Sequence, residues 1–265
     1  EKERIEVIVK QYDIDTIYHL VALMSATGEQ NPQLAWKLNM GSLHNILEIA
    51  REQELTRLFW PSSIGVFGPS TPRTETPQET ILLPTTIYGV TKVAGELLCN
   101  YYFHKYGVDV RSIRFPGIIS SETPPGGGTT DYAVEIFYEA LKRKRYTCFL
   151  DKDTVLPFLY MPDCIKATID LMKTPLSQIK RHDGYNVTGT SFSPEELASE
   201  IMKHIPEFRW NYRPDFRQKI ADSWPMSIDD SQSRQEWGWK PDYDLPSMTQ
   251  DMLERLSRRF AEGKL

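Results

Sequence analysis

The sequence of 265 residues is poor in cysteine, and its few histidines are scattered. The three cysteines, at 99, 148 and 164, are odd in number and form no CxxC motif, which argues against a disulfide framework and against structural zinc. The five histidines show no metal-ligand spacing, so we expect no metal site. No apolar run approaches the roughly 20 residues of a membrane-spanning helix. A membrane is therefore not an expected partner.

Basic residues are fewer than acidic ones. Lys and Arg number 31 against 36 Asp and Glu, and the formal net charge of -5 weighs against a nucleic-acid partner. The one basic cluster, KRKR at 142–145, closes a helical pattern, where basic side chains favour the negative end of the helix dipole. The first residues, EKERIEVIVKQ, are charged and lack a signal-peptide core. These residues leave a mitochondrial and a cytoplasmic location equally open.

The first 120 residues alternate between two kinds of segment. Short apolar segments predict strands, and segments with apolar residues at helical spacing predict helices. Asn31 and Pro32 are expected at the cap and first position of the first helix, and Gly107 at the end of the second. This order predicts a parallel sheet with right-handed crossovers. The expected strands are 15–22, 56–63 and 108–115, and the expected helices are 31–53 and 88–106.

The rhythm changes beyond residue 120. A glycine-rich loop, PPGGG at 124–128, precedes shorter elements. The motif SPEE predicts a capping box between Ser193 and Glu196. The other expected helices are 130–145, from Asp163 to 173, and 246–260, and the expected strands are 146–150, 156–161 and 185–187.

One Tyr-x-x-x-Lys pair has the context of an active site. The spacing occurs at Tyr88/Lys92, Tyr101/Lys105 and Tyr138/Lys142, so the spacing alone is uninformative. In an open parallel sheet, ligands bind beyond the carboxyl ends of the strands. Only the first pair follows such an end at a short distance, with Ser63 25 residues before the tyrosine and the RFPG strand end after it. We therefore select Tyr88 and Lys92.

These residue types support a specific chemistry. A free tyrosine has a pKa of about 10 and is a poor base at neutral pH. An ammonium one helical turn away favours the phenolate, and a phenolate can take a proton from an alcohol while a hydride leaves the same carbon. No side chain accepts a hydride, so the pair implies a nicotinamide cofactor.

The motifs resemble the extended short-chain dehydrogenase/reductase superfamily and, more narrowly, its NAD-dependent L-threonine 3-dehydrogenases of the nucleotide-sugar-epimerase-like type. YxxxK is shared by the whole superfamily and is weakly specific. PGGGTTDYA (125–133) and ADSWPMSIDDS (221–231) are more particular to the threonine enzymes. The resemblance implies an α/β protein with a Rossmann-type doubly wound parallel sheet. It also implies a partial NAD-binding domain over 1–120 and a substrate-binding region over 121–265, interleaved with the last strands.

The resemblance also implies a role for individual residues. Tyr88 would accept the proton, Lys92 would hold the nicotinamide ribose and tune Tyr88, and Ser63 would bind the substrate hydroxyl. The cofactor would be lined by Leu20, Ala22, Asn39, Pro116 and Ile118. The carboxylate and amine of L-threonine would be held by Ser25, Gly28, Thr129 and Thr130, with Trp224 closing the pocket.

Several of these residues have simpler interpretations. Ser25 and Ser63, taken singly, are ordinary strand-end caps. Asn39 lies inside a helix, where a local backbone bond is as good an explanation as a cofactor contact. Trp224 is of a type more often found in a core than in a pocket. His19 is expected to be a buried core residue.

The sequence departs from the superfamily at its start. The strand, glycine-rich turn and helix that receive the cofactor pyrophosphate have no counterpart, so we expect this sequence to belong to a longer protein. The expected activity is oxidation of L-threonine with NAD to 2-amino-3-oxobutanoate, by a homodimer formed through helices 31–53 and 88–106. The alternatives are a nucleotide-sugar 4-epimerase and a non-catalytic remnant without the phosphate loop.

Overall fold

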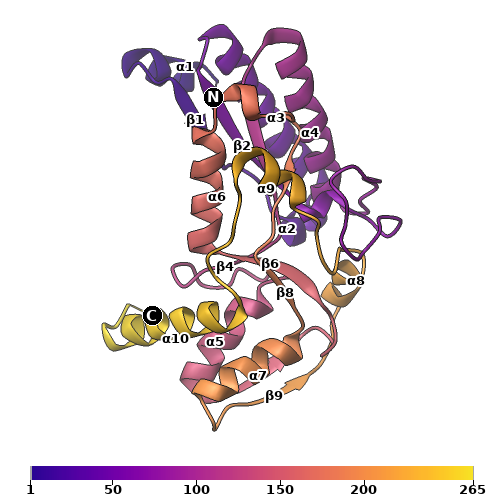
Figure 1. The fold of residues 1–265 in the computed structure, drawn as a ribbon, viewed down its shortest axis with the longest axis vertical. Coiled ribbons are helices and arrows are strands. Elements are labelled where there is room, and N and C mark those ends of the chain that lie inside the picture. The colour runs from indigo at the N-terminus through magenta and orange to yellow at the C-terminus, as the bar shows by residue number, and fades with distance from the viewer. Residues whose placement is uncertain (1, 265) are drawn as a thin grey trace.

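The computed structural model describes residues 2–264 and contains a parallel sheet at its centre (Figure 1). Its strands are β1 (Thr16–Tyr18), β2 (Arg57–Ser63), β3 (Val110–Phe115) and β7 (Tyr185–Asn186), hydrogen-bonded in that order. All three pairings are parallel. Ser63 lies opposite Phe115, so β2 and β3 end side by side. Their carboxyl ends therefore form one edge where a ligand can bind.

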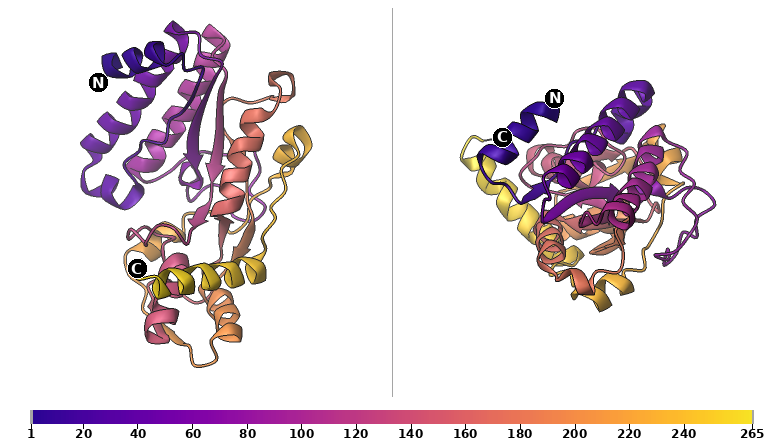
Figure 2. Two further views of the ribbon diagram at one scale, coloured as in Figure 1. Left: turned by 90° about the vertical axis from the view of Figure 1, so that its left-hand side faces the viewer. Right: turned by 90° about the horizontal axis from the view of Figure 1, so that it is seen from above.

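Helices cover both faces of this sheet (Figure 2). On one face lie α3 (Pro32–Glu52) and α4 (Ile87–Tyr106), which bury Leu43, Leu47 and Cys99 against Leu58 and Trp60 of β2. On the other face lie α6 (Met161–Lys173) and α9 (Ser231–Trp237), whose core includes Leu171, Trp237 and the β2 residue Phe59. Side chains of a strand alternate between faces, so β2 serves both cores. The expected Rossmann-type doubly wound α/β fold is confirmed.

A second layer of elements lies beyond the carboxyl ends of the strands (Figure 1). It contains the sheet β4-β6-β8 and the parallel pair β5-β9. Its core joins α5, α7 and α10 through Phe137, Leu197 and Met252. The strands are β4 (Gly117–Ile119), β5 (Arg145–Cys148), β6 (Leu156–Tyr160), β8 (Thr190–Phe192) and β9 (Arg209–Tyr212); the helices are α5 (Tyr132–Arg143), α7 (Pro194–His204), α8 (Arg217–Ala221) and α10 (Leu245–Ala261).

The remaining elements are short or terminal. Helix α1 (Lys2–Gln11) packs on α3, and α2 (Ser25–Gln30) lies between β1 and α3 along the chain. Two 3₁₀ turns are η1 (Ile64–Val66) and η2 (Leu176–Gln178). Strand β7 joins the main sheet although it lies in the second half of the chain. The division at residue 120 stays a prediction.

Three local expectations need correction. The strand expected at 15–22 ends at Tyr18, because β1 pairs with β2 only as far as Phe59. The side chain of Asn31 makes no cap hydrogen bond, although Pro32 does begin α3 as expected. Helix α6 begins at Met161 rather than at Asp163.

Two terminal signals are confirmed. Gly107 ends α4 with a φ of 73°, the left-handed conformation that glycine adopts without strain. Ser193 and Glu196 form the expected capping box at α7. Among residues 2–264, no helix combines the length and the apolar character needed to cross a bilayer.

Candidate active site

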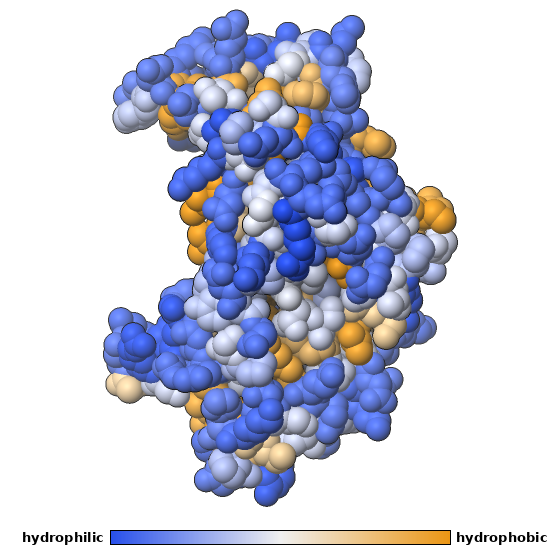
Figure 3. Space-filling model, in the orientation of Figure 1, coloured by the Kyte–Doolittle hydropathy of each residue, from blue (hydrophilic) through white to orange (hydrophobic). Residues whose placement is uncertain are grey.

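A cavity of about 720 Å³ opens at the carboxyl ends of β2 and β3. Its walls come from the segment after β1, the ends of β2 and β3, the first turns of α4 and α6, the glycine-rich loop and Trp224. Apolar surface lies beside α6, above the hollow between α6 and α10 (Figure 3). The predicted site residues that line the cavity are Leu20, Ala22, Ser25, Ser63, Tyr88, Lys92, Pro116, Ile118, Thr129, Thr130 and Trp224.

The first turn of α4 brings Tyr88 against the end of β2. The Thr86 side chain caps the helix by accepting from the Gly89 backbone N–H at 3.1 Å. A Cβ atom on Gly89 would lie 2.2 Å from the Gly65 carbonyl oxygen, so only glycine permits this close approach. The ring of Tyr88 in turn covers Gly65, whose added Cβ would be 3.1 Å from the ring. Glycines on both sides therefore set the position of the phenol.

Lys92 is anchored to the strand by its ammonium. Its Nζ donates to the Pro61 carbonyl oxygen at 2.5 Å and lies 4.6 Å from the centre of the Trp60 ring. The Phe59 carbonyl accepts from the His19 backbone N–H on the β1 side. The Pro61 carbonyl, two residues further along β2, points to the same side as the Phe59 carbonyl. It lies beyond the end of β1, so no β1 residue pairs with it, and proline has no N–H that would be left unpaired there. The truncated pairing of β1 thus creates the binding point for Lys92.

The protonation of the pair differs from the sequence-based expectation. Burial raises the pKa of Tyr88 above its ordinary value, and a hydrogen bond with Ser63 opposes this in part. Lys92 lies 5.5 Å from the centre of the Tyr88 ring and does not produce the expected lowering of the Tyr88 pKa. Burial lowers the pKa of Lys92 to about 8, against the raising influence of Cys99 and Glu96. The phenolate therefore needs positive charge beyond that of the protein alone.

The wall formed by the glycine-rich loop has polar groups available. Thr129 is buried, and its hydroxyl has no hydrogen-bond partner among the described residues. Asp131 accepts from the backbone N–H groups of Gly126 and Gly128, which holds the loop closed on itself. The lining also contains Trp224, whose carbonyl accepts from Nε of Arg73.

Two predicted residues lie outside the cavity lining. The Asn39 amide accepts from the Leu23 N–H at 2.7 Å and donates to the Leu23 carbonyl and to Thr91. These bonds reach residues 16 and 52 positions away, so they replace the expected local backbone bond, and through Leu23 Asn39 holds the segment that carries Leu20 and Ala22. Gly28 packs against Ala35 and Ile87. A cofactor role for Asn39 and a substrate role for Gly28 stay predictions.

One wall was missed in the sequence. The first turns of α6 line one side of the cavity. The lining residues recur three and four residues apart in the sequence, and this helical spacing was the signal that could have identified them. The residues on this face are Met161, Cys164, Ile165, Thr168 and Ile169.

The cavity fits the nicotinamide half of a dinucleotide. Leu20, Ala22, Pro116 and Ile118 supply apolar walls, and Lys92 supplies a cation near the phenol. Besides Lys92, the only charged residue of the described lining is Asp131, so this cavity itself offers no second cation for a pyrophosphate. Within residues 2–264, no group of acidic, histidine and cysteine side chains could hold a metal ion.

A parallel sheet with a buried tyrosine–lysine pair at its carboxyl edge defines an oxidoreductase-type site of the short-chain dehydrogenase/reductase kind. The NAD dependent epimerase/dehydratase family matches residues 1–187, and the chain belongs to this family. An uncharacterized epimerase/dehydratase of Staphylococcus haemolyticus is 54% identical over 259 residues, which cover 97% of this chain and 81% of the relative. One from Staphylococcus aureus is 52% identical over 260 residues, with 98% and 81% covered.

Several solved structures with about half of their residues identical are described as threonine dehydrogenases. The L-threonine dehydrogenase of Phytophthora infestans has a TM-score of 0.96 and 54% identity over 98% of this chain and 84% of that one. The enzyme of Clostridium difficile has a TM-score of 0.96 and 52% identity, with 98% and 81% covered. A UDP-glucose 4-epimerase of Thermotoga maritima, at 19% identity over 98% of this chain and 82% of that one, has a TM-score of 0.86 and shares the fold.

Proposed function

We propose that the protein oxidises the side-chain hydroxyl of L-threonine with NAD to 2-amino-3-oxobutanoate. The observation that carries this proposal is the meeting of Tyr88 and Ser63 with the loop of Thr129 and Thr130 in one cavity. Similar structures at about 50% identity are L-threonine 3-dehydrogenases, which supports the same substrate. The fold of NAD-dependent epimerases and dehydratases supplies the cofactor class.

The chain's own residues divide the reaction between them. NAD, when bound, supplies the hydride acceptor. Tyr88 takes the hydroxyl proton as a phenolate, and Ser63 orients that hydroxyl through its own. Because burial raises the pKa of Tyr88 and Lys92 alone does not offset this, the ammonium of Lys92 would favour the phenolate together with the positive ring of bound NAD. Lys92 also holds the nicotinamide ribose in this proposal.

The rest of the cavity would hold the amino-acid part of the substrate. Ser25 and Thr130 line it with hydroxyl groups, and the unpartnered hydroxyl of Thr129 is free to bind a ligand. These groups suit a carboxylate and an amine. Trp224 would exclude water from the reacting carbon.

The two alternatives have less support. The epimerase similarity is at 19% identity and reaches only the fold. A non-catalytic remnant would not need the close-packed Tyr88, Lys92 and Ser63 arrangement seen at the strand ends. The three cysteines are buried and free, which suits an enzyme of the cytoplasm or of a mitochondrion.

Turnover by the purified protein tests the proposal. With L-threonine and NAD we expect formation of NADH, measured at 340 nm, and none with UDP-glucose. Tyr88→Phe should lower kcat by about 10²- to 10⁴-fold, the usual value of a positioned acid–base group, with NAD affinity retained. Tyr101→Phe is the matched control, because Tyr101 has the same Lys spacing but is 51% exposed on the outside of α4. Equal activity of the two variants would refute the assignment of Tyr88.

We also propose that two copies associate through α3 and α4. Both helices expose large apolar side chains, with Leu34 and Leu38 on α3, and Val90, Leu97 and Tyr101 on α4. The α4 residues recur seven and four residues apart, which forms one stripe along the helix. One of the similar structures is described as a monomeric L-threonine 3-dehydrogenase, so association needs its own test.

A further inference from the structure

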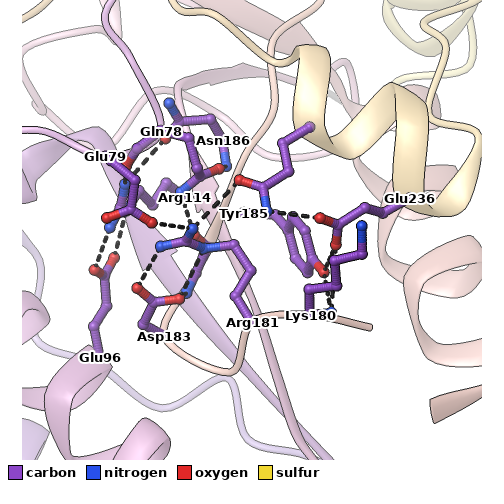
Figure 4. A network of polar contacts seen from close by, with 12 residues as sticks. Gln78, Glu79, Glu96, Arg114, Lys180, Arg181, Asp183, Tyr185, Asn186 and Glu236 are labelled. Carbon is purple, nitrogen blue, oxygen red and sulfur yellow. Dashed lines mark hydrogen bonds and ion pairs between the residues drawn. The ribbon is translucent and has the colours of Figure 1, made fainter. Parts of the chain in front are cut away.

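A buried ion pair lies one helical turn beyond Lys92. Glu96 of α4 is 1% exposed and Arg114 of β3 is 2% exposed. Arg114 donates from Nε to Glu96 Oε1 at 2.9 Å and from Nη2 to Oε2 at 2.8 Å, a bidentate arrangement (Figure 4). Two parallel hydrogen bonds fix the relative orientation of the two side chains more strictly than a single bond does.

The pair reaches the end of the strand that carries the site. Ser62 donates from its hydroxyl to Glu96 Oε1 at 2.5 Å. Ser62 follows Pro61, whose carbonyl accepts from Lys92, and precedes Ser63, whose hydroxyl accepts from the Gly65 N–H. Lys92 and Glu96, one turn apart on α4, therefore bind the adjacent residues Pro61 and Ser62 of β2.

The other side of the pair is tied to the segment that leads to Trp224. Arg114 donates to the Gln78 carbonyl at 3.0 Å and to the Asn186 side chain at 3.3 Å (Figure 4). Asn186 donates in turn to the Thr76 carbonyl, and the Thr76 N–H donates to the Ser227 carbonyl at 3.0 Å. A buried polar network with its partners satisfied holds its members rigidly.

We propose that the Glu96–Arg114 pair, acting through Ser62, is the positioning device that holds Lys92 and the end of β2 in place for the proposed reaction. A buried ion pair is often no more stabilising than apolar side chains of similar volume, so stability alone gives little reason for one here. Its link to the residues beside Lys92 supplies that reason. The expected effect on kcat rests on the proposed function. The expected effect on the position of the end of β2 rests only on the contacts described above.

Removal of the charge of Glu96 should change the kinetics in a specific way. We expect Glu96→Gln to lower kcat about ten- to hundredfold, as small misplacements of reacting groups do, with the KM for threonine within about twofold. The alkaline limb of the kcat profile should move to lower pH. Burial lowers the pKa of Lys92, Cys99 and Glu96 raise it, and losing the carboxylate lets the ammonium deprotonate earlier as pH rises. His19 and the rings of Trp60 and Tyr88, which also face Lys92, are unchanged in this variant.

Strand β3 offers a matched control. Arg111 forms a buried bidentate pair with Asp109 and donates to the carbonyls of Leu171 and Thr174 at the end of α6. Asp109→Asn breaks an ion pair of the same kind away from Ser62. It should lower stability and leave kcat and the pH profile unchanged. A fall in kcat and a shift of the alkaline limb as large as those of Glu96→Gln would overturn the proposal.

A second variant separates stability from positioning. Glu96→Gln leaves Arg114 as a buried cation without its counterion, which itself lowers stability. Glu96→Gln combined with Arg114→Met removes that cation, so the melting temperature should recover while the lowered kcat and the shifted limb remain. Recovery of kcat in the double variant would show that the pair acts only through stability.

Hydrogen–deuterium exchange tests the positioning without any turnover. Peptides over 60–67 should exchange faster in Glu96→Gln and in Ser62→Ala, which keeps the ion pair and removes only its link to β2. In Asp109→Asn the faster exchange should fall on 108–112 instead. Unchanged exchange over 60–67 in both Glu96→Gln and Ser62→Ala would refute the inference. A wild-type protein that is inactive with threonine would refute the proposed substrate and leave this readout standing.

Discussion

At the scale of single residues, burial decides which charges the site can hold. His19, next to β1, is 6% exposed, which confirms its expected place in the core. Its Nε2 lies 3.1 Å from the Ser42 hydroxyl. Burial lowers the pKa of His19 to about 4, and the charge of Lys92 acts in the same direction. The imidazole is therefore neutral in the folded protein at physiological pH.

This burial predicts a loss of stability in acid. The unfolded chain binds a proton at His19 below about pH 6.5, whereas the folded chain does so only near pH 4. As pH falls through this window, the free energy of unfolding should decrease by up to about 3 kcal/mol from this residue. Urea denaturation at pH 7 and pH 4.5 measures the difference. His19→Gln should remove this part of the pH dependence, and an unchanged dependence would contradict the assignment.

Single-residue inference from the sequence succeeded where a neighbour along the chain supplied the context. Tyr88 was separable from Tyr101 and Tyr138 because strand ends flank it, and the cavity contains only the first of these three. The partners of Glu96 and Asn39 come from elements 16 to 52 residues away, and no local pattern encodes such pairs. The burial that raises the pKa of Tyr88 is likewise a property of the packed structure.

At the scale of elements, strong local signals predicted type and position well. Helices α3, α4 and α10 lie within one residue of the expected bounds. Strand β1 is shorter than expected because its length depends on pairing with β2, which its own sequence does not show. Helix α2 was missed because six residues, SATGEQ, contain no apolar repeat. Tertiary packing, rather than local sequence propensity, sets the length of β1 and the presence of α2.

Local packing predicts opposite effects for alanine substitutions at Gly95 of α4 and Gly41 of α3. A Cβ on Gly95 would lie 2.4 Å from the Trp60 ring, so Gly95→Ala should lower stability by about 1–3 kcal/mol through overpacking. Gly41 of α3 has no atom within 4 Å of its added Cβ. Gly41→Ala should therefore raise stability by up to about 1 kcal/mol through helix propensity. Thermal unfolding of the pair checks both signs, and a destabilised Gly41→Ala or a neutral Gly95→Ala would contradict this packing.

At the scale of the whole molecule, the helices on one face of the sheet leave apolar side chains exposed to solvent. The face of α3 and α4 presents its apolar stripe to solvent, with Leu97 64% exposed. Contiguous apolar surface of this kind is typical of an interface between proteins.

Association through this face predicts a change of mass on substitution. Leu97→Glu places a charge in the stripe and should convert a dimer into a monomer in light scattering after gel filtration. Leu176→Glu is the control, because Leu176 is 43% exposed but lies in η2, outside α3 and α4. A monomeric wild type, or a dimer that survives Leu97→Glu, would refute the proposed interface.

The bridge between Arg73 and the segment after Trp224 has a consequence for the order in which the molecule assembles. The Met226 N–H donates to the Arg73 carbonyl at 2.7 Å, which joins two segments that about half of the chain separates. Closing so long a loop costs conformational entropy, and the contacts that offset this cost form only once the loop is closed. Such long-range contacts therefore form late in folding. On a ribosome, the phenol and the ammonium of α4 are made well before the tryptophan wall. A nascent chain therefore passes through a stage at which the reactive pair is open to water, and the pocket is completed only when the segment around Trp224 has docked.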